Sequence, residues 1–170
     1  PIAGALRLLR ERRGDLQMAL AVAPSLDPHL FDQELAGLPV ARVEGDTHAL
    51  LSAASAGIVA SGTATVEAAL MDLPMVVVYR VSPLTYALGR PFVRVPRSAM
   101  ANLLAGREAV QELSQGDFQP EAVRAEVAAL LDDPGRREPV RQGLAEIRAR
   151  LGPPGASARA AAVVARVLGQ

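Results

Sequence analysis

Short apolar runs alternate with amphipathic stretches through the first half of the chain. The apolar runs end at proline, glycine or polar residues and predict strands at 16–23, 39–43, 56–60 and 75–79. Apolar residues between them recur at helical spacing, which predicts helices at 2–13, 27–36, 46–54 and from a small-residue turn at 61–65 to residue 72. This alternation is typical of α/β domains.

The predicted strands are almost continuously apolar, which indicates a parallel sheet covered by helices on both faces. We therefore predict an α/β fold with a Rossmann-like, doubly wound parallel sheet. Ligands of such sheets bind beyond the carboxyl ends of the strands. One edge should thus be lined by the turns at Pro24, Glu44-Gly45, Ser61–Thr65 and Arg80–Pro83.

The pattern changes after Pro83. A short helix at 84–89, a strand-like run at 92–95 and an irregular stretch at 100–106 precede three predicted helices at 120–131, 135–151 and 156–168. Gly152-Pro153-Pro154-Gly155 predicts a turn or hinge before the last of them. We predict one domain over 1–170 that includes the C-terminal helices from about residue 120.

Composition narrows the functional classes. Eighteen basic and eighteen acidic residues cancel, and aromatic residues make up 3%, so the chain is not expected to bind nucleic acid. The absence of cysteine excludes disulfides and thiolate metal sites and fits a cytoplasmic protein. No apolar run reaches the about 20 residues of a membrane span. The chain begins at Pro1 inside a predicted helix, so we expect it to be part of a longer protein.

The turn Ser61–Thr65 is the first candidate site. It offers backbone N–H groups and three hydroxyls at the start of a helix, which suits phosphate, although serine and threonine are also ordinary helix caps. It lacks the G-x-G-x-x-G pattern and the lysine of a P-loop, so neither NAD nor ATP chemistry is indicated and no cofactor is expected. His29 and His48 are single and distant in sequence, so no metal site is expected.

Three further side chains have both a structural and a functional interpretation. Glu67 is either a first-turn acid favoured by the helix dipole or an acceptor for a ribose diol; position 64 is alanine, so no capping box explains it. Arg80 follows a strand and is either an ion-pair partner or a ligand contact. Asn102 is either a turn former or a ligand contact.

Three motifs follow one another between residues 60 and 108. Residues 60–68 read Ala-Ser-Gly-Thr-Ala-Thr-Val-Glu-Ala, residues 74–86 read Pro-Met-Val-Val-Val-Tyr-Arg-Val-Ser-Pro-Leu-Thr-Tyr, and residues 102–108 read Asn-Leu-Leu-Ala-Gly-Arg-Glu. In order and spacing these motifs resemble the lipid-A-disaccharide synthase family, as do Val-Gln-Glu-Leu at 110–113 and the Pro-Glu pair at 120–121. Met100-Ala101 stands where the family is expected to have Leu-Pro. The resemblance implies the C-terminal, donor-binding half of a GT-B glycosyltransferase.

The family resemblance also implies a reaction and a set of contacts. UDP-2,3-diacylglucosamine would donate its sugar to 2,3-diacylglucosamine 1-phosphate, giving the β-1,6-linked lipid A disaccharide and UDP, without a metal. Glu67 would hold the ribose hydroxyls, Arg80 and Asn102 would contact phosphate or sugar, and backbone groups around Glu44 and Gly45 would hold the uracil. The diphosphate would lie against Ser61, Gly62, Thr63, Ala64 and Thr65.

The family's interdomain loop and acceptor domain, with its candidate general base, are not represented in this sequence. We therefore expect no catalytic residue here, no transferase activity from the chain alone, and weak binding of UDP or the UDP-sugar. The apolar last helix is expected to pack on another domain or on a second subunit as a homodimer. In the full-length enzyme, the protein is expected in the cytoplasm, peripheral on the inner membrane. Alternatives are a UDP-sugar epimerase, a transferase for another lipid acceptor, or a non-catalytic Rossmann-like interaction domain.

Overall fold

The structure is a computed structural model that describes residues 1–82, 85–86 and 99–169. Its strands are all parallel and form two hydrogen-bonded sheets. One pairs β1 (Met18–Val22) with β2 (Val40–Glu44). The other has the order β3-β4-β5, with β3 at Gly57–Ala60, β4 at Met75–Tyr79 and β5 at Glu112–Ser114. The predicted α/β class with parallel strands and interleaved helices is confirmed, although no ladder joins the two sheets among the described residues.

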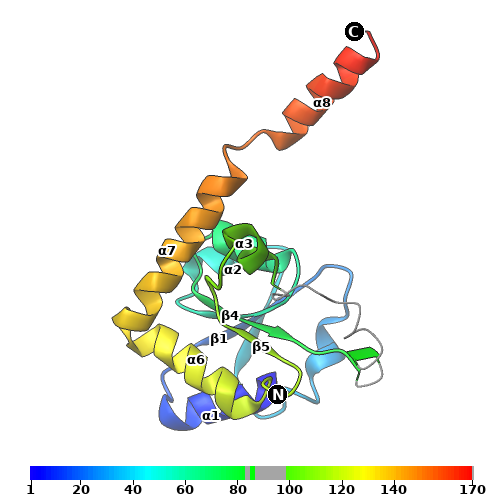
Figure 1. The fold of residues 1–170 in the computed structure, drawn as a ribbon. Helices are drawn as coiled ribbons and strands as arrows, with labels where there is room; N and C mark the ends of the chain where they lie inside the picture. The colour runs from blue at the N-terminus through cyan, green and yellow to red at the C-terminus, as the bar shows by residue number, and fades with distance from the viewer. Residues whose placement is uncertain (83–84, 87–98, 170) are drawn as a thin grey trace.

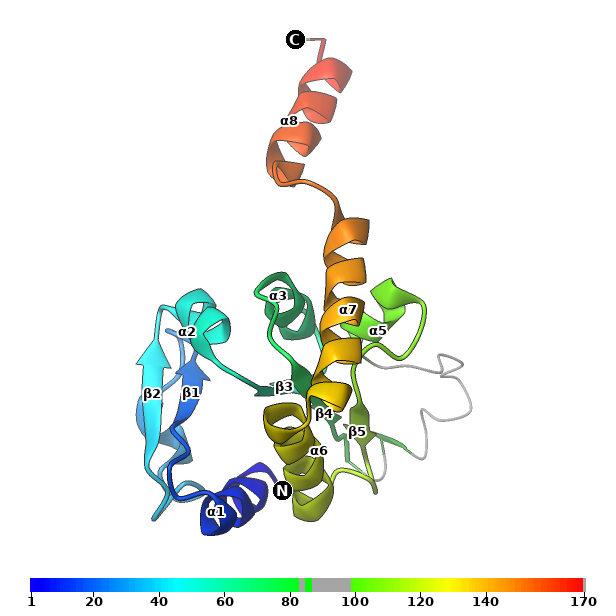
Figure 2. The ribbon, with the colours of Figure 1, turned by 90° about the vertical axis from the view of Figure 1, so that its left-hand side faces the viewer.

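Helices cover both faces of the larger sheet, as Figure 2 shows. Successive residues of β4 point to opposite faces, so Val76 and Val78 pack in one core cluster and Met75 and Val77 in the other. The first face is covered by α1 (Ile2–Arg12) and α6 (Pro120–Asp132). The second is covered by α3 (Ala64–Leu70), α5 (Met100–Ala105) and α7 (Pro134–Leu151).

The strands β1 and β2 are less buried than their apolar sequences predict. In β1 only Val22 is buried, and in β2 no residue is. The helix α2 (Thr47–Ala53) packs against this pair. The prediction of full burial on both faces is therefore right for β4, where the first four residues are buried, and wrong for the β1-β2 pair.

Two local predictions differ from the structure. Residues 27–36 form only a short 3-10 helix, Pro28–Phe31, followed by turns. Arg7 of α1 donates to the carbonyls of Glu34 and Ala36, at 2.9 and 3.3 Å, so these acceptors bind a side chain from another element. The stretch 100–106, predicted as irregular, is the helix α5, and the predicted elements at 84–89 and 92–95 lie almost wholly outside the described residues.

The last helix, α8 (Ala156–Val167), stands away from the rest of the molecule (Figure 1). The predicted break before it is confirmed, with Gly152 and Gly155 at φ angles of 75° and 98°. None of its residues is buried, and Val163, Val164 and Val167 are 57%, 57% and 80% exposed. An apolar helix face is thus left uncovered in this chain.

Candidate functional site at the carboxyl ends of β2 and β3

The turn between β3 and α3 connects the two elements by backbone hydrogen bonds. The Ser61 N–H donates to the Val78 carbonyl of β4 at 3.0 Å, which extends the sheet by one residue. Gly62 has a φ of 142°, a conformation that favours glycine, and no atom of the described residues lies within 4 Å of the place of an added Cβ. The N–H groups of Gly62, Thr63 and Ala64 have no acceptor among the described residues. These donors lie at the start of α3, where Thr63 and Ala64 are exposed.

Thr65 turns away from this open space, contrary to the prediction that all three hydroxyls of the turn are available to a ligand. Its side chain is completely buried. The hydroxyl donates to the Gly62 carbonyl at 2.7 Å and accepts from the Ala101 N–H at 3.2 Å. Thr65 therefore fixes the turn against α5.

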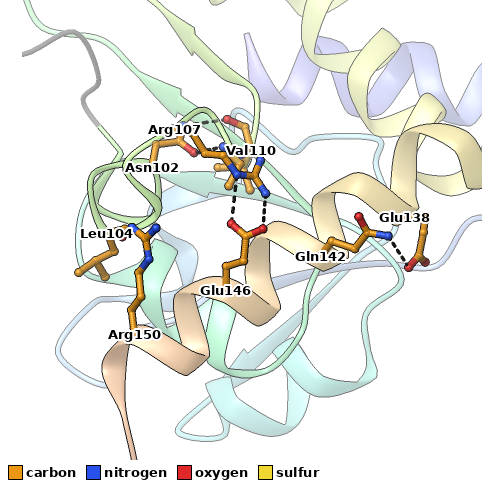
Figure 3. Close-up of polar contacts among 9 residues, drawn as sticks. Asn102, Leu104, Arg107, Val110, Glu138, Gln142, Glu146 and Arg150 are labelled. Carbon is orange, nitrogen blue, oxygen red and sulfur yellow. Dashed lines mark hydrogen bonds and ion pairs between the residues drawn. The ribbon is translucent and has the colours of Figure 1, made fainter.

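Asn102 is also completely buried, on α5 rather than in a loop. Its amide nitrogen donates to the Val110 carbonyl at 2.8 Å and to Glu112 Oε1 at 2.7 Å. Its amide oxygen accepts from the N–H groups of Ala109 and Val110, at 2.8 and 3.0 Å (Figure 3). All four hydrogen bonds of the amide are thus made inside the chain. This arrangement supports the segment before β5 and gives no support to the predicted contact with phosphate or sugar.

Arg80 leaves the carboxyl end of β4 as predicted, but its guanidinium turns to the segment between β5 and α6. It donates to the carbonyls of Gln115, at 3.1 Å, and Phe118. The guanidinium carbon also lies 5.0 Å from the centre of the Phe118 ring, a cation–π distance. The structure therefore gives Arg80 a role in holding this segment.

Glu67 lies one turn into α3 and faces α2. Its Oε2 atom is 3.9 Å from Nε2 of His48, and the two side chains are 46% and 69% exposed. Both helices follow strand ends. Helix α2 begins after Gly45, which has a φ of 76°, and Asp46 caps the helix by accepting from the Ala49 N–H at 3.3 Å. The structure thus brings Glu67, Glu44-Gly45 and His48 to one region.

Helix α7 contacts the C-terminal end of α3 through two arginines. Arg148 donates to the Ala69 carbonyl at 2.9 Å and to Asp72 Oδ1 at 2.8 Å, and Arg141 lies 3.6 Å from the same carboxylate. Asp72 has a φ of 59°, which is unusual for a residue other than glycine. The sequence alone gives no sign that Arg141 and Arg148 have Asp72 as their partner.

A second contact joins α7 to the segment after α5, and Figure 3 shows it. Arg107 donates two hydrogen bonds to the Glu146 carboxylate, at 3.1 and 2.9 Å. These hydrogen bonds lower the pKa of Glu146 and raise the pKa of Arg107. Arg150 donates to the Leu104 carbonyl at 2.6 Å, next to the carboxyl end of α5. Helix α7 therefore fixes α3 and α5, while no such contact joins α7 to α2 in the described part of the chain.

A pocket between α6 and α7 lies away from the candidate site. It is lined by Met75, Gln111 and Val140, among others, and so opens at the amino ends of β4 and β5. Its arginines bind nearby carboxylates: Arg107 pairs with Glu146, and Arg136 pairs with Glu126 at 2.9 Å. The opposite, carboxyl edge is where parallel α/β sheets bind ligands.

The described part of the chain contains neither a metal-binding cluster nor a membrane-spanning helix. Within it, no group of three or more His, Cys, Asp or Glu side chains is arranged to hold a metal ion. No helix in the same residues is both long and apolar enough to cross a bilayer.

Parallel strands, helices on both faces and polar turns at the carboxyl edge define a Rossmann-like α/β domain, consistent with the C-terminal half of a GT-B glycosyltransferase. A family model described as lipid-A-disaccharide synthetase matches residues 1–165. The chain belongs to this family.

Curated relatives are similar over nearly the whole chain. The lipid-A-disaccharide synthase of Anaeromyxobacter dehalogenans strain 2CP-1 is 44% identical over 171 residues, covering 99% of this chain and 45% of the relative. That of Myxococcus xanthus is 44% identical over 169 residues, covering 98% and 44%. That of Acidobacterium capsulatum is 48% identical over 152 residues, covering 89% and 37%. The chain spans less than half the length of these relatives.

Proposed function

We propose that this chain is the donor-binding part of a lipid-A-disaccharide synthase. It binds UDP-2,3-diacylglucosamine, whose sugar is transferred to 2,3-diacylglucosamine 1-phosphate to give the lipid A disaccharide and UDP. The family match over 1–165 supports this class of reaction. The observation that carries the assignment of the site is the group of N–H donors at Gly62, Thr63 and Ala64, which have no acceptor among the described residues and lie one helical turn before Glu67.

In this proposal the diphosphate lies against the turn. The N–H groups of Gly62, Thr63 and Ala64 donate to phosphate oxygens, because backbone donors at a turn suit an anion without a metal. Ser61 contributes to the same wall of the site. Thr65 does not contact the diphosphate. Its hydroxyl supports the turn by donating to the Gly62 carbonyl and accepting from the Ala101 N–H.

The nucleoside lies on the α2 side of the diphosphate. The Glu67 carboxylate accepts hydrogen bonds from the ribose hydroxyls and remains accessible at 46% exposure. The uracil lies near Glu44 and the left-handed Gly45, where no atom of the described residues is within 4 Å of an added Cβ. Arg80 and Asn102 support the segments behind the site, a role supported by their hydrogen bonds to Phe118 and Val110.

The acceptor and the general base belong to the rest of the enzyme, since the relatives are more than twice as long as the part that this chain matches. The chain alone is therefore expected to bind UDP and to have no transferase activity. The uncovered apolar face of α8 packs on that other part or on a second subunit. The full-length enzyme works in the cytoplasm at the inner membrane, where its lipid-linked substrates reside.

Calorimetric titration with UDP tests this proposal. Glu67→Ala should weaken UDP binding by about tenfold, since two hydrogen bonds to a charged acceptor are lost. Glu121→Ala is the matched control, because Glu121 is likewise an acid in the first turn of a helix, α6. A folded chain that does not bind millimolar UDP, or equal affinities for the Glu67→Ala and Glu121→Ala variants, would contradict the proposed site.

A further inference from the structure

We propose that His48 is a further nucleotide-binding residue, and that it shares one ribose hydroxyl with Glu67. This inference rests on the proposed function and adds a contact from a different helix. The Nε2 atom of His48, on α2, is 3.9 Å from Oε2 of Glu67, on α3. The two side chains belong to helices that begin after different strands, β2 and β3.

The gap between His48 Nε2 and Glu67 Oε2 fits one oxygen atom. At 3.9 Å the atoms are too far apart for a direct hydrogen bond. A single oxygen at about 2.8 Å from each atom fits between them, with an angle of about 90° at that oxygen. A hydroxyl in this place donates its proton to the carboxylate of Glu67 and accepts one from Nε2 of His48. The gap thus has the size of one alcohol oxygen.

Both side chains are accessible to solvent. The side chains of His48 and Glu67 are 69% and 46% exposed, so a ligand can reach both. Ion pairs this exposed contribute little to folding, which leaves their approach without a structural explanation. Both adjoining turns are free of close contacts from the described residues, none of which has an atom within 4 Å of an added Cβ at Gly45 or Gly62.

Ser52 anchors α2 to the residue that follows α3. The Ser52 hydroxyl lies 2.9 Å from the His48 carbonyl and 3.2 Å from the sulfur of Met71, which follows α3. This contact joins the two helices on the side away from their first turns. This contact limits sliding of α2 along α3 and so keeps His48 beside Glu67, as a shared ligand requires.

A vicinal diol is the chemical group that this pair recognises. One hydroxyl bridges His48 and Glu67, and the neighbouring hydroxyl donates to the second carboxylate oxygen of Glu67. A nucleotide without these hydroxyls loses both contacts. The prediction is therefore specific for ribose over dideoxyribose and does not involve the base or the diphosphate.

The test measures the binding of UDP and 2′,3′-dideoxy-UDP to the chain by calorimetry. We expect His48→Ala to weaken UDP binding by about three- to tenfold and to leave dideoxy-UDP binding unchanged. His48→Gln, which keeps an N–H donor at a similar reach, should stay within about twofold of the wild type. His29→Ala is the matched control, because His29 is a 74% exposed histidine paired with Asp32 at 3.0 Å on another element.

The outcomes distinguish the role of His48 from the proposed function. Absence of UDP binding by the folded wild-type chain would overturn the proposed function and this inference together. Normal preference for UDP over dideoxy-UDP in His48→Ala would overturn only the role of His48. A loss of affinity for both nucleotides would also contradict the shared hydroxyl, because it would indicate a contact with the diphosphate or a general effect on the site.

Discussion

The Thr65 hydroxyl of α3 accepts a hydrogen bond from the Ala101 N–H at the start of α5, 3.2 Å away. The same hydroxyl donates to the Gly62 carbonyl at 2.7 Å, so one buried side chain connects the candidate phosphate turn to a helix 36 residues later. The turn is therefore shaped by tertiary contacts as well as by its own sequence.

Replacing Thr65 with Val should cost stability without adding bulk. The variant leaves the buried Ala101 N–H without its acceptor, at a cost of about 1–3 kcal/mol in the free energy of unfolding. The Gly62 carbonyl loses the hydroxyl but still accepts from the Thr65 N–H at 3.2 Å. Urea denaturation measures this change. Thr65→Ser keeps the hydroxyl and should lose less than Thr65→Val. A Thr65→Val variant as stable as Thr65→Ser would show that the hydrogen bonds do not matter.

Asn102 should be among the most sensitive polar positions to truncation. Asn102→Ala removes four hydrogen bonds and leaves the buried N–H groups of Ala109 and Val110 unpaired, which should cost about 3 kcal/mol or more. Leu103→Ala on the same helix is the control, because Leu103 is 49% exposed and should cost far less. Similar unfolding midpoints for the two variants would refute the role of Asn102 in supporting β5.

Gly143 permits α7 to approach the segment before β5. A Cβ added there would lie 2.7 Å from the Ala109 Cβ, so Gly143→Ala should destabilise the chain by about 1–3 kcal/mol in spite of the better helix propensity of alanine. Ala109→Gly in the same chain should restore part of this loss, which a double-mutant cycle measures as a favourable coupling. Additive effects of the two substitutions would contradict the close contact.

The Arg107–Glu146 pair predicts a pH dependence of stability. Hydrogen bonding to Arg107 lowers the pKa of folded Glu146 from its ordinary value of 4.5. The contribution of this pair is therefore present above pH 4.5 and is lost as the pH falls below 4.5 through the folded pKa. Glu146→Gln should lose less stability than the wild type between about pH 6 and pH 3. Equal losses in both proteins would exclude a contribution from this pair.

The sequence predicted the parts of the fold that depend on local patterns. The apolar runs located β1 to β4, and Gly152 and Gly155 marked the break before α8. These features depend on hydrophobic spacing, capping and backbone conformation within a few residues.

The parts that it did not predict depend on partners far along the chain. Asparagine is a residue type that is common in turns. Asn102 is buried because residues 109–112 pack against it and form hydrogen bonds with its side chain. The guanidinium of Arg148 is bound by Asp72, 76 residues earlier. The closeness of His48 and Glu67 likewise depends on the packing of two helices that the sequence placed separately.

Titration of the isotope-labelled chain with UDP, followed by backbone amide NMR shifts, tests the central claim most directly. The account predicts saturable shifts at Gly62, Thr63 and Ala64, together with Gly45 and Glu67, and small shifts at Gln111 and Val140 in the pocket between α6 and α7. Saturable shifts confined to that pocket, or no shifts with the chain folded, would contradict the assignment of the nucleotide to the carboxyl ends of β2 and β3.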